Sequence, residues 1–558
     1  MASVLKSPRA MLGRRSWFAP ALLLLLCGFL YFFRLGQLPL KDFDEAFYAG
    51  GAQEMLARHE FITPYLNGVP LLLKPILIYW LIAASYHLFG ICEFAARIWS
   101  ALSATGVVLL VYAFGKRQIN PRAGFLAALM LACSYQWVDE GRDASIDMPL
   151  TLLLTAALMI FFLALQRPAR QSGYAVLWAY PLLGLACLAK GPAPIAVCLA
   201  GLLVYLIAVR QMDGIVGRLR LFPGLALFLL TALPWYVAEE IRQPAFLSTF
   251  LISQHLGHLV GDAARTSPPW GHLTNTFEFF FPWSLLLPAA FVGLSGGWRR
   301  PGVMSFAAYL SIVIIGLFSL SQAKLAHYIA PAFPFLALLV STLADDWLRR
   351  KEKAPLSIRR SFGAMLLLGI CLLASLILLT ESRWRSLAYF WGVEWGAGEW
   401  PLYLLALLAV GCVGSALLAR ARRRQAALTS MVVMTLLANA LVVFVINPRV
   451  ALVEDQPRKE LALLAARCLS PRGRLAVYHT KLVATTVYSR RAVTDLSPDS
   501  PGAVAEFLRK FPGSAVITRS DLLPRLRKQG VGVLWARRRD FVIVESAPII
   551  VGSRAGSS

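Results

Sequence analysis

Acidic residues are scarce in this sequence. Its 558 residues include 30 Asp and Glu against 55 Lys and Arg, which gives a formal net charge of +25. A basic excess of this size raises the question of nucleic-acid binding, but the basic residues occur in short clusters between apolar blocks. Such clusters are typical of orientation signals and anionic-lipid contacts in membrane proteins. We therefore expect membrane lipids as partners and no nucleic acid.

Cysteine and nucleotide-binding motifs are also scarce. Seven of the eight Cys residues lie in the apolar region and only Cys468 lies in the polar C-terminal part, so no disulfide framework is readable. No P-loop or glycine-rich dinucleotide signature appears on a strand–helix unit. The basic N-terminus precedes an apolar run without a small-residue cleavage site, so we expect an uncleaved first span.

Apolar residues, in contrast, are abundant. They make up 58% of the chain, against about 45–50% in soluble domains, and recur in blocks of about 16–21 residues, the length that spans a bilayer. With the basic clusters in the cytoplasm, these blocks predict a polytopic α-helical membrane protein of about 13 transmembrane helices. The segment from Pro75 to Phe89 would reverse the side of every later loop if it spanned, so we interpret it as a short interfacial or re-entrant helix.

The predicted spans divide the chain into two domains. Residues 1–446 form a transmembrane domain with long outside loops at 34–94 and 238–280. Residues 447–558 are more polar, and their strand-like and helix-like segments predict a soluble α/β domain with a layered, partly parallel sheet. That domain shows no catalytic motif, and the topology places it on the outer side.

Unusual polar residues gather on this outer side. Any one of them could be an interfacial anchor whose charge snorkels to water. Lys190 and Lys324 fit that reading less well, because they lie in very short outside turns, where the positive-inside bias disfavours them. The candidate site residues on this face are Asp44, Glu45, Lys74, Asp147, Lys190, His255, Arg265, Lys324, His327 and Tyr328.

Acids and cations at a membrane surface suit an anionic, lipid-linked substrate. Lys and Arg neutralise phosphate, and a carboxylate can orient a reacting group, accept a proton or hold a sugar hydroxyl or amine. No nucleotide is expected outside the cytoplasm, so the energy must arrive in a preactivated lipid-phosphate donor. No cofactor is expected; the scattered His residues leave room for a divalent metal but lack the ligand spacing that would indicate one.

Several motifs together resemble the GT-C membrane glycosyltransferases. They are the outside DE pair of DEAFYAG, the KPILIYW element at Lys74, the aspartate of GRDASIDMPL, the turn LAKGPAP and the stretch QAKLAHYIAP. Within that class the sequence is most similar to the branch of protein O-mannosyltransferases and lipid A aminoarabinose transferases. The resemblance implies a GT-C fold with periplasmic juxtamembrane helices between the first two spans, and a periplasmic C-terminal domain.

The resemblance also implies roles for individual residues. Asp44, with Glu45 beside it, and Asp147 would be catalytic. The residues that would bind the donor phosphate are Lys74, Lys190, Lys324 and Arg265. The residues that would contact substrate are Tyr48, Tyr79, His255, His327 and Tyr328.

The sequence departs from the family pattern at four places. Phe47 and Gly50 replace an Arg and a Glu after the DE pair, Leu73 stands where a Glu often precedes KP, and the H-x2-R element of the long loop reads HLGH. These departures affect the sugar contacts and the acceptor more than the fold.

The resemblance implies a monomeric enzyme of the bacterial inner membrane, with its active site in the periplasm. It would transfer 4-amino-4-deoxy-L-arabinose from undecaprenyl phosphate to a lipid A phosphate, and so confer resistance to polymyxin and cationic peptides. Two alternatives stay open: a polyprenyl-phosphate-mannose-dependent protein O-mannosyltransferase, and a lipid-phosphate flippase. The flippase is disfavoured because the polar residues concentrate at one face rather than at mid-membrane, and because the spans show no internal repeat.

Overall fold

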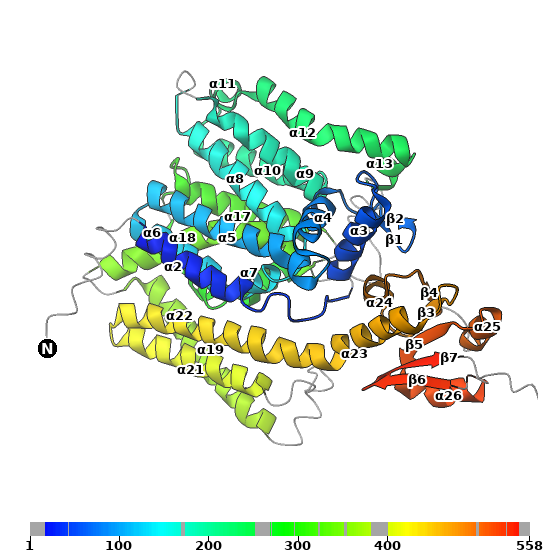
Figure 1. Cartoon of the computed structure of the whole chain (residues 1–558). Helices are drawn as coiled ribbons and strands as arrows, with labels where there is room; N and C mark the ends of the chain where they lie inside the picture. Colours follow the sequence, from blue (N-terminus) through cyan, green and yellow to red (C-terminus); the bar gives the residue numbers. More distant parts are fainter. Residues whose placement is uncertain are drawn as a thin grey trace, which may run out of the picture. The chain divides into compact units, whose positions relative to one another are not determined.

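The computed structural model describes residues 17–545, except 43, 169–172, 251–267, 269, 295, 322–323, 351–353, 381–399, 498–501, 530 and 532. The chain forms two compact units (Figure 1). The bundle unit comprises Met1–Leu35, Leu72–Leu81 and Arg97–Ile446, and the sheet unit comprises Gly36–Leu71, Ile82–Ala96 and Asn447–Ser558. Two helices, α4 (Leu77–Phe89) and α5 (Glu93–Gln118), contribute residues to both units.

All regular secondary structure in the described part of the bundle unit is helical. Its first half contains α2 (Phe18–Cys27), η1 (Gly28–Phe32), α6 (Pro121–Cys133), α7 (Tyr135–Glu140), α8 (Asp147–Leu165), η3 (Tyr174–Trp178), α9 (Ala179–Lys190), α10 (Ala193–Val209), α11 (Ile215–Leu219), α12 (Leu221–Arg242) and α13 (Phe246–Thr249). Its second half contains α15 (Gly271–Phe279), η6 (Trp283–Leu286), α16 (Leu287–Gly293), α17 (Val303–Ser319), η7 (Ala326–Ala332), α18 (Phe333–Arg349), α19 (Leu356–Thr380), α21 (Trp400–Arg420), α22 (Arg424–Leu441) and η9 (Val442–Ile446).

Many of these helices are apolar enough to lie in a membrane. Among the described residues, seven helices are long and apolar enough to cross it, or eight if the bent pair formed by α15 and η6–α16 is one span. Shorter apolar helices of 10–17 residues include α2–η1, α6, α10 and α17. The length and composition of the helices therefore support a multi-pass protein, and the count of about 13 spans stays a prediction.

The spans differ in how deeply they are buried. The apolar windows of α8 and of η7–α18 are each 72% buried within the protein, whereas those of α12, α19 and α21 are 17%, 22% and 28% buried. Because α8 and η7–α18 are surrounded by other helices, polar groups at their ends are shielded by protein. The other three helices present apolar faces to their surroundings, as lipid-facing helices do.

Three loops that the sequence places in the cytoplasm meet at one end of the bundle unit. The side chain of Asn120 caps α6 and also donates to a carboxylate oxygen of Asp345, near the end of α18, at 3.0 Å. Arg424, the first residue of α22, donates to the main-chain carbonyls of Trp347, at 2.7 Å, and Arg350. The basic clusters at residues 115–122, 349–360 and 420–424 therefore lie on the same side, as the positive-inside rule requires.

The sheet unit contains a five-stranded mixed sheet. Its strands are β3 (Leu475–Tyr478), β4 (Val493–Asp495), β5 (Ala515–Arg519), β6 (Val533–Arg538) and β7 (Phe541–Glu545), in the order β4-β3-β5-β7-β6. β3 pairs parallel with β4 and β5, and β7 pairs antiparallel with β5 and β6. The helices of this part are α23 (Asn447–Cys468), α24 (Leu482–Ser489), α25 (Ala503–Lys510), η10 (Ser520–Leu522) and α26 (Leu523–Lys528).

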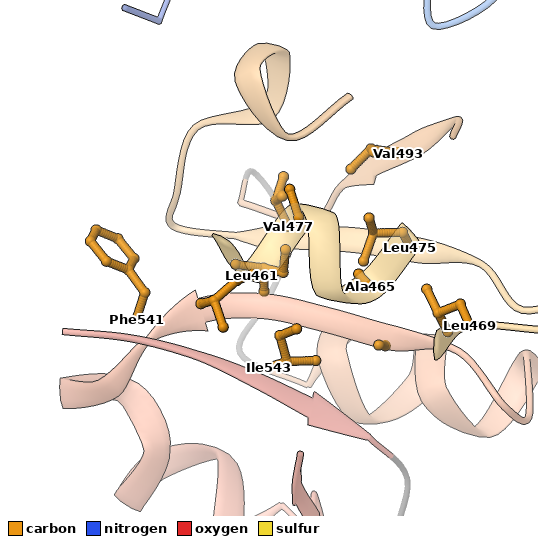
Figure 2. Packing of buried hydrophobic residues seen from close by; sticks show 11 residues of the cluster. Leu461, Ala465, Leu469, Leu475, Val477, Val493, Phe541 and Ile543 are labelled. Atoms are coloured by element: carbon orange, nitrogen blue, oxygen red, sulfur yellow. The ribbon is translucent and has the colours of Figure 1, made fainter. Parts of the chain in front are cut away.

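Alternating side chains of the sheet fill two separate cores. Leu475 and Val477 of β3 pack with Leu461 and Ala465 of α23 on one face (Figure 2). Ala476, on the opposite face of the same strand, packs in a second core with residues of α25 and α26. This is the two-residue period of a strand buried on both sides, and it makes the sheet unit a helix–sheet–helix sandwich.

The segment Gly36–Leu71 also belongs to the sheet unit. It contains α3 (Asp44–Arg58) and the short antiparallel strands β1 (Tyr65–Leu66) and β2 (Val69–Pro70). The Asn67 side chain donates to the carbonyl of Val493 at 2.7 Å and accepts from its N–H at 2.8 Å. A carboxylate oxygen of Asp42 accepts from the N–H of Ala484 at 2.8 Å, so a distant residue caps the first turn of α24.

The sequence located most of these elements. A short helix was expected from Pro75 to Phe89 and is present as α4. The strand-like segments RLAVYH, SAVITR, VGVLWA and FVIVE correspond to β3, β5, β6 and β7 of the partly parallel sheet. Sequence reasoning missed α23, α24 and the three-residue strand β4. The sequence of α23 contains an internal Pro457, and the alternation that marks a strand is too short to recognise in β4.

Candidate functional site

The candidate site lies at the start of α8, in the bundle unit. Asp147 is the first residue of this helix, and Pro149 follows in its first turn, an arrangement that favours helix initiation. The Nζ atom of Lys190, at the C-terminus of α9, lies 2.5 Å from Oδ1 of Asp147. Their side chains are 11% and 7% exposed, so this is a nearly buried ion pair, formed where the turns at the ends of α8 and α9 meet.

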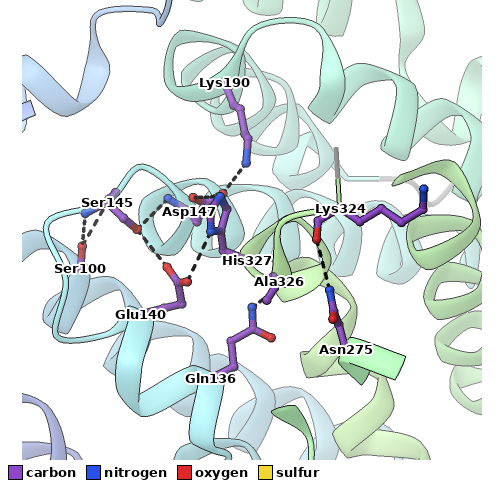
Figure 3. A network of polar contacts seen from close by, with 10 residues as sticks. All are labelled: Ser100, Gln136, Glu140, Ser145, Asp147, Lys190, Asn275, Lys324, Ala326 and His327. Atoms are coloured by element: carbon purple, nitrogen blue, oxygen red, sulfur yellow. Dashed lines mark hydrogen bonds and ion pairs between the residues drawn. The ribbon is translucent and has the colours of Figure 1, made fainter. Parts of the chain in front are cut away.

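His327 of η7 lies between two carboxylates (Figure 3). Its Nε2 is 3.9 Å from Oδ2 of Asp147, and its Nδ1 is 3.8 Å from Oε1 of Glu140. The Ser145 hydroxyl donates to Glu140 at 3.3 Å and accepts the N–H of Asp147 at 3.2 Å. The two acids are thus connected both through the imidazole and through a serine.

The η7 segment that carries His327 is held in place by neighbouring helices. Gln136 of α7 donates to the carbonyl of Ala326 at 2.7 Å, and the ammonium of Lys190 lies 4.3 Å from the ring centroid of Tyr328. A cation over a tyrosine ring is stabilised electrostatically. Lys190 therefore contacts both Asp147 and the aromatic residue next to His327.

A cavity of about 350 Å³ adjoins this ion pair. Lys74, Lys190 and Tyr328 are its principal polar side chains, together with Ser321. Most of the remaining wall is apolar and consists of Leu73, Pro75, Pro192, Ala193, Ala196, Phe250, Leu317, Phe318 and Leu320. A site with a few cations in an otherwise apolar cavity suits a ligand with an anionic group attached to a hydrocarbon chain.

The charges around Asp147 are predominantly positive. The ammonium of Lys190 pairs with the carboxylate of Asp147, the imidazole of His327 lies 3.9 Å from it, and Lys74 adds positive potential nearby, against the cost of burying the charge. An ionised carboxylate held among cations can accept hydrogen bonds from the hydroxyl or amino groups of a sugar, and the cations can neutralise phosphate. The arrangement is suited to bringing an uncharged or cationic sugar and one or more phosphates into the same space.

The structure brings some predicted residues together. Asp147 contacts Lys190 and lies 3.9 Å from His327, the ammonium of Lys190 also lies near the ring of Tyr328, and Lys74 lines the same cavity as Lys190. Lys324 lies on the loop before η7, where its ammonium donates to the carbonyl of Ser321 at 2.8 Å and its side chain extends away from Asp147 (Figure 3).

The remaining predicted residues belong to other elements or lie outside the described residues. Tyr79 is fully buried in α4. Asp44, Glu45 and Tyr48 belong to α3 of the sheet unit, where Asp44 is exposed, Tyr48 is buried, and buried Glu45 accepts from the Lys41 N–H at 2.7 Å. His255 and Arg265 lie outside the described residues.

Sequence reasoning missed three members of the network: Gln136, Glu140 and Ser145. Gln136 and Glu140 are four residues apart on the short helix α7 and therefore share a face, and both reach η7. Residues Leu126 to Val138 read as one apolar span in the sequence, and this hid the helix, because the apolar composition continues through the break at Ser134 between α6 and α7. The acid-rich stretch VDEGRDASID was the available signal, but only two of its acids were considered.

Comparison with known proteins now decides the family. Residues 73–237 match the family described as dolichyl-phosphate-mannose-protein mannosyltransferase. A relative from Pseudomonas paraeruginosa, named undecaprenyl phosphate-α-4-amino-4-deoxy-L-arabinose arabinosyl transferase, is 31% identical over 73% of this chain and 72% of its own length. The chain belongs to this family of arabinosyl transferases. A second member, transferase 1 of Pseudomonas fluorescens, is 30% identical over 71% and 72% of the two chains.

Solved structures show the same fold. The crystal structure of ArnT from Cupriavidus metallidurans bound to undecaprenyl phosphate is similar with a TM-score of 0.78 and 22% identity, over 97% of this chain and 100% of that one. The oligosaccharyltransferase of Archaeoglobus fulgidus has a TM-score of 0.54 and 12% identity, over 92% and 70%. The chain is thus a multi-pass membrane glycosyltransferase of the GT-C fold that uses a lipid-linked sugar. The predicted GT-C fold and enzyme class are confirmed, and the count of about 13 spans stays a prediction.

Proposed function

We propose that this arabinosyl transferase family member moves 4-amino-4-deoxy-L-arabinose from undecaprenyl phosphate to a phosphate of lipid A, at the periplasmic face of the bacterial inner membrane. The observation that carries the proposal is the buried Asp147–Lys190 pair beside an apolar cavity that also contains Lys74. The names of the relatives from two Pseudomonas species supply the sugar and the lipid carrier.

The cavity suits the lipid end of the donor. Its apolar wall, with Phe250, Leu317 and Phe318, would contact the first isoprene units, and burial of that chain is favourable. Lys74 and Lys190, on the same wall, would neutralise the donor phosphate as point charges. The proposed roles of Lys324 and Arg265 are supporting ones, adding positive charge for donor or acceptor phosphate.

The proposed reaction is a displacement at the anomeric carbon of the sugar. An oxygen of the acceptor phosphate forms a bond to this carbon, the bond to the donor phosphate oxygen breaks, and undecaprenyl phosphate leaves with the electron pair. We expect inversion at that carbon. Because a phosphate acceptor is already anionic near neutral pH, the attack requires no strong general base.

Electrostatics explain why lysines and carboxylates are both needed. Two like charges about 4 Å apart repel by about 4 kcal/mol at an effective dielectric constant of 20, so two phosphates cannot meet without cations. We assign Asp147 to holding the amine or hydroxyls of the sugar, with Asp44 and Glu45 assisting. Tyr48, Tyr79, His255, His327 and Tyr328 are proposed as further substrate contacts.

The proposal also covers the membrane topology, the oligomeric state and the effect on peptide binding. We propose about 13 membrane spans, a transmembrane domain of residues 1–446 with periplasmic loops at 34–94 and 238–280, and a periplasmic domain of residues 447–558. The protein would act as a monomer. The resulting change to lipid A would reduce its negative charge and so weaken binding of polymyxin and other cationic peptides.

A second candidate is supported by the match of residues 73–237 to the protein mannosyltransferase family. In that reaction the acceptor is a neutral Ser or Thr hydroxyl, which needs a general base such as Asp44. The density of lysine around the cavity favours an anionic acceptor over a neutral one.

Mass spectrometry of lipid A tests the proposal. Cells that express the protein together with the donor pathway should contain lipid A with the added mass of an aminopentose, and cells with the Asp147→Asn variant should not. The exposed Lys116→Ala variant, at the opposite end of the bundle unit, is a matched control that should modify lipid A normally. Unmodified lipid A together with a hexose on secreted protein would select the mannosyltransferase instead.

A further inference from the structure

A second cavity lies in the bundle unit, away from the candidate site. Its volume is about 460 Å³. It is formed where the end of α18 and the start of α19 meet the turn between α21 and α22. Its lining residues are Trp347, Ala354, Leu356, Ile358, Arg359, Arg360, Phe362, Gly363, Ala419, Arg420, Arg422 and Arg424.

This arginine cavity is strongly basic. Five of its lining residues are Arg, and the lining contains no acidic residue. Arg359, Arg360, Arg420 and Arg422 are exposed, and none of the four forms an ion pair within the described part of the chain. A cavity with several exposed guanidinium groups and no carboxylate among its lining residues favours an anionic ligand, because Arg binds phosphate through two parallel hydrogen bonds.

The cavity is a built feature and not a loose group of surface side chains. Arg424 donates to the main-chain carbonyls of Trp347 and Arg350, which fixes the start of α22 against the end of α18. The rings of Trp347 and Phe362 pack 5.0 Å apart, and both side chains are almost fully buried. The positions of the arginines on this wall are therefore set by packed elements.

Further along α19 and α21 from the arginines, the surface becomes apolar. Leu356, at the cavity, is 58% exposed, and further along α19 the side chains of Leu367 and Ile370 are 64% and 52% exposed. Leu417 on the neighbouring helix α21 is 51% exposed. The basic cavity and the apolar surface next to it together fit a ligand with an anionic head in the cavity and hydrocarbon chains along α19 and α21.

The arginine cavity is distinct from the candidate catalytic site. His327 precedes α18 and Trp347 lies near its end, and a helix of 17 residues is about 25 Å long. The arginine cavity also lies at the end where three basic loops meet, which the positive-inside rule assigns to the cytoplasm. Basic pockets between membrane helices on that side bind phospholipid headgroups.

We propose that the arginine cavity binds the headgroup of an anionic glycerophospholipid, such as phosphatidylglycerol or cardiolipin, from the leaflet opposite the catalytic cavity. The phosphodiester is held by Arg359, Arg360 and Arg422, and the acyl chains lie against α19 and α21. The bound lipid ties the start of α19 to the α21–α22 turn. This site needs neither the sugar donor nor the acceptor, so it does not depend on the proposed function.

The test compares lipid binding by matched double variants of the full-length protein, purified in a neutral detergent. Binding of phosphatidylglycerol, phosphatidylcholine with the same acyl chains, and inorganic phosphate is measured by native mass spectrometry and by the rise in Tm. The test variant is Arg359→Gln/Arg360→Gln. The control variant is Arg299→Gln/Arg300→Gln, an adjacent pair in another basic loop that is likewise exposed and loses the same charge.

The native protein should bind phosphatidylglycerol in preference to phosphatidylcholine, and inorganic phosphate should leave Tm unchanged. The test variant should bind phosphatidylglycerol about tenfold more weakly or worse, and the control variant should bind it normally. Equal loss in both variants, or equal binding of both lipids, overturns the proposal, and stabilisation by inorganic phosphate replaces it with a soluble-anion site. If the test variant is poorly folded in detergent alone, Arg422→Gln provides the same comparison with one substitution.

Discussion

The ammonium of Lys190 lies 2.5 Å from a carboxylate oxygen of Asp147, and both side chains are almost fully enclosed by protein. A buried ion pair of this kind contributes little net stability, because desolvation of the two charges offsets their attraction. Its presence beside a cavity is better explained by function, since charged groups held in a dry environment act strongly on whatever binds next to them.

Removal of one member of this pair should separate its structural role from its chemical role. Lys190→Met removes the ammonium partner of a buried carboxylate and should lower the free energy of unfolding by about 3–5 kcal/mol. The double variant Asp147→Asn/Lys190→Met should recover most of that stability, yet lose sugar transfer by at least about 100-fold, as Asp147→Asn alone should. Thermal unfolding in detergent and mass spectrometry of the product measure the two quantities. Substantial transfer by the stable double variant would remove Asp147 from the mechanism.

Glu140 should act as a positioning residue for His327. Its carboxylate lies 3.8 Å from Nδ1 of the imidazole, so Glu140→Gln should let the ring rotate and lower kcat by about tenfold, with a smaller effect on KM for the donor. The neighbouring Asp139→Asn removes the same charge from the same short helix and should leave kcat nearly unchanged. A purely structural role for Glu140 would instead lower Tm and leave kcat of the folded fraction unchanged.

Lys74 should contribute directly to donor affinity. It lines the same cavity as Lys190, and loss of one charge-assisted contact to phosphate costs about 1.5–3 kcal/mol, or about 10- to 150-fold in Kd. Binding of undecaprenyl phosphate to Lys74→Ala, measured in detergent, should show this loss, whereas the exposed Lys116→Ala should bind normally. Unchanged affinity in Lys74→Ala would exclude a phosphate contact.

The apolar wall of the cavity can be tested by filling it. Ala196 of α10 lines the cavity and is exposed, so Ala196→Trp should narrow the cavity without overpacking the core. We expect weaker binding of undecaprenyl phosphate by about tenfold and an unchanged Tm. Leu199→Trp, on an exposed part of the same helix, is the control. Equal affinity in both variants would place the prenyl chain elsewhere.

The local stability of the sheet unit around Asp42 should depend on pH. Burial raises the pKa of Asp42 above its ordinary value, although the N–H of Ala484 and the nearby Lys481 act in the opposite direction. Between the ordinary and the raised pKa the folded state binds more protons than the unfolded state, so local stability falls as pH rises through that range. Amide-exchange protection of α24 in the full chain should follow this trend and lose it in Asp42→Asn, which keeps a hydrogen-bond acceptor.

A matched control distinguishes this local effect from general titration. Asp521→Asn changes an acid of the same unit whose side chain is 62% exposed, so the pH trend should persist in that variant. A trend that survives in Asp42→Asn would assign it to another group.

The helical bundle could be predicted from the sequence because many apolar blocks and basic loops indicate it independently. Apolar blocks recur along most of the chain, and the basic loops between them constrain one another, so the helical class of fold does not depend on any single block. The same logic identified Lys190 and Lys324 as unusual. It could not show that Lys190 pairs with Asp147 while the ammonium of Lys324 extends away, because side-chain direction depends on packing between helices.

The local network of the site was less accessible to sequence analysis. Gln136 and Glu140 act from a helix of six residues, which is too short to give a periodic signal. Their partners on η7 lie almost 190 residues later in the chain, and no pattern in one sequence connects such positions. The cap that Asp42 gives to α24, across 442 residues, was hidden for the same reason.

The make-up of the sheet unit has a consequence for biosynthesis. Asn67 exchanges two hydrogen bonds with Val493, 426 residues further along, and the Leu40 N–H donates to the Tyr488 hydroxyl at 2.7 Å. The segment Gly36–Leu71 is therefore synthesised long before its partners and cannot pack against them until nearly the whole chain has left the ribosome. During that interval α3 and its short hairpin expose surfaces that are buried in the finished protein, which makes this stage the most vulnerable to proteases and the most dependent on chaperones.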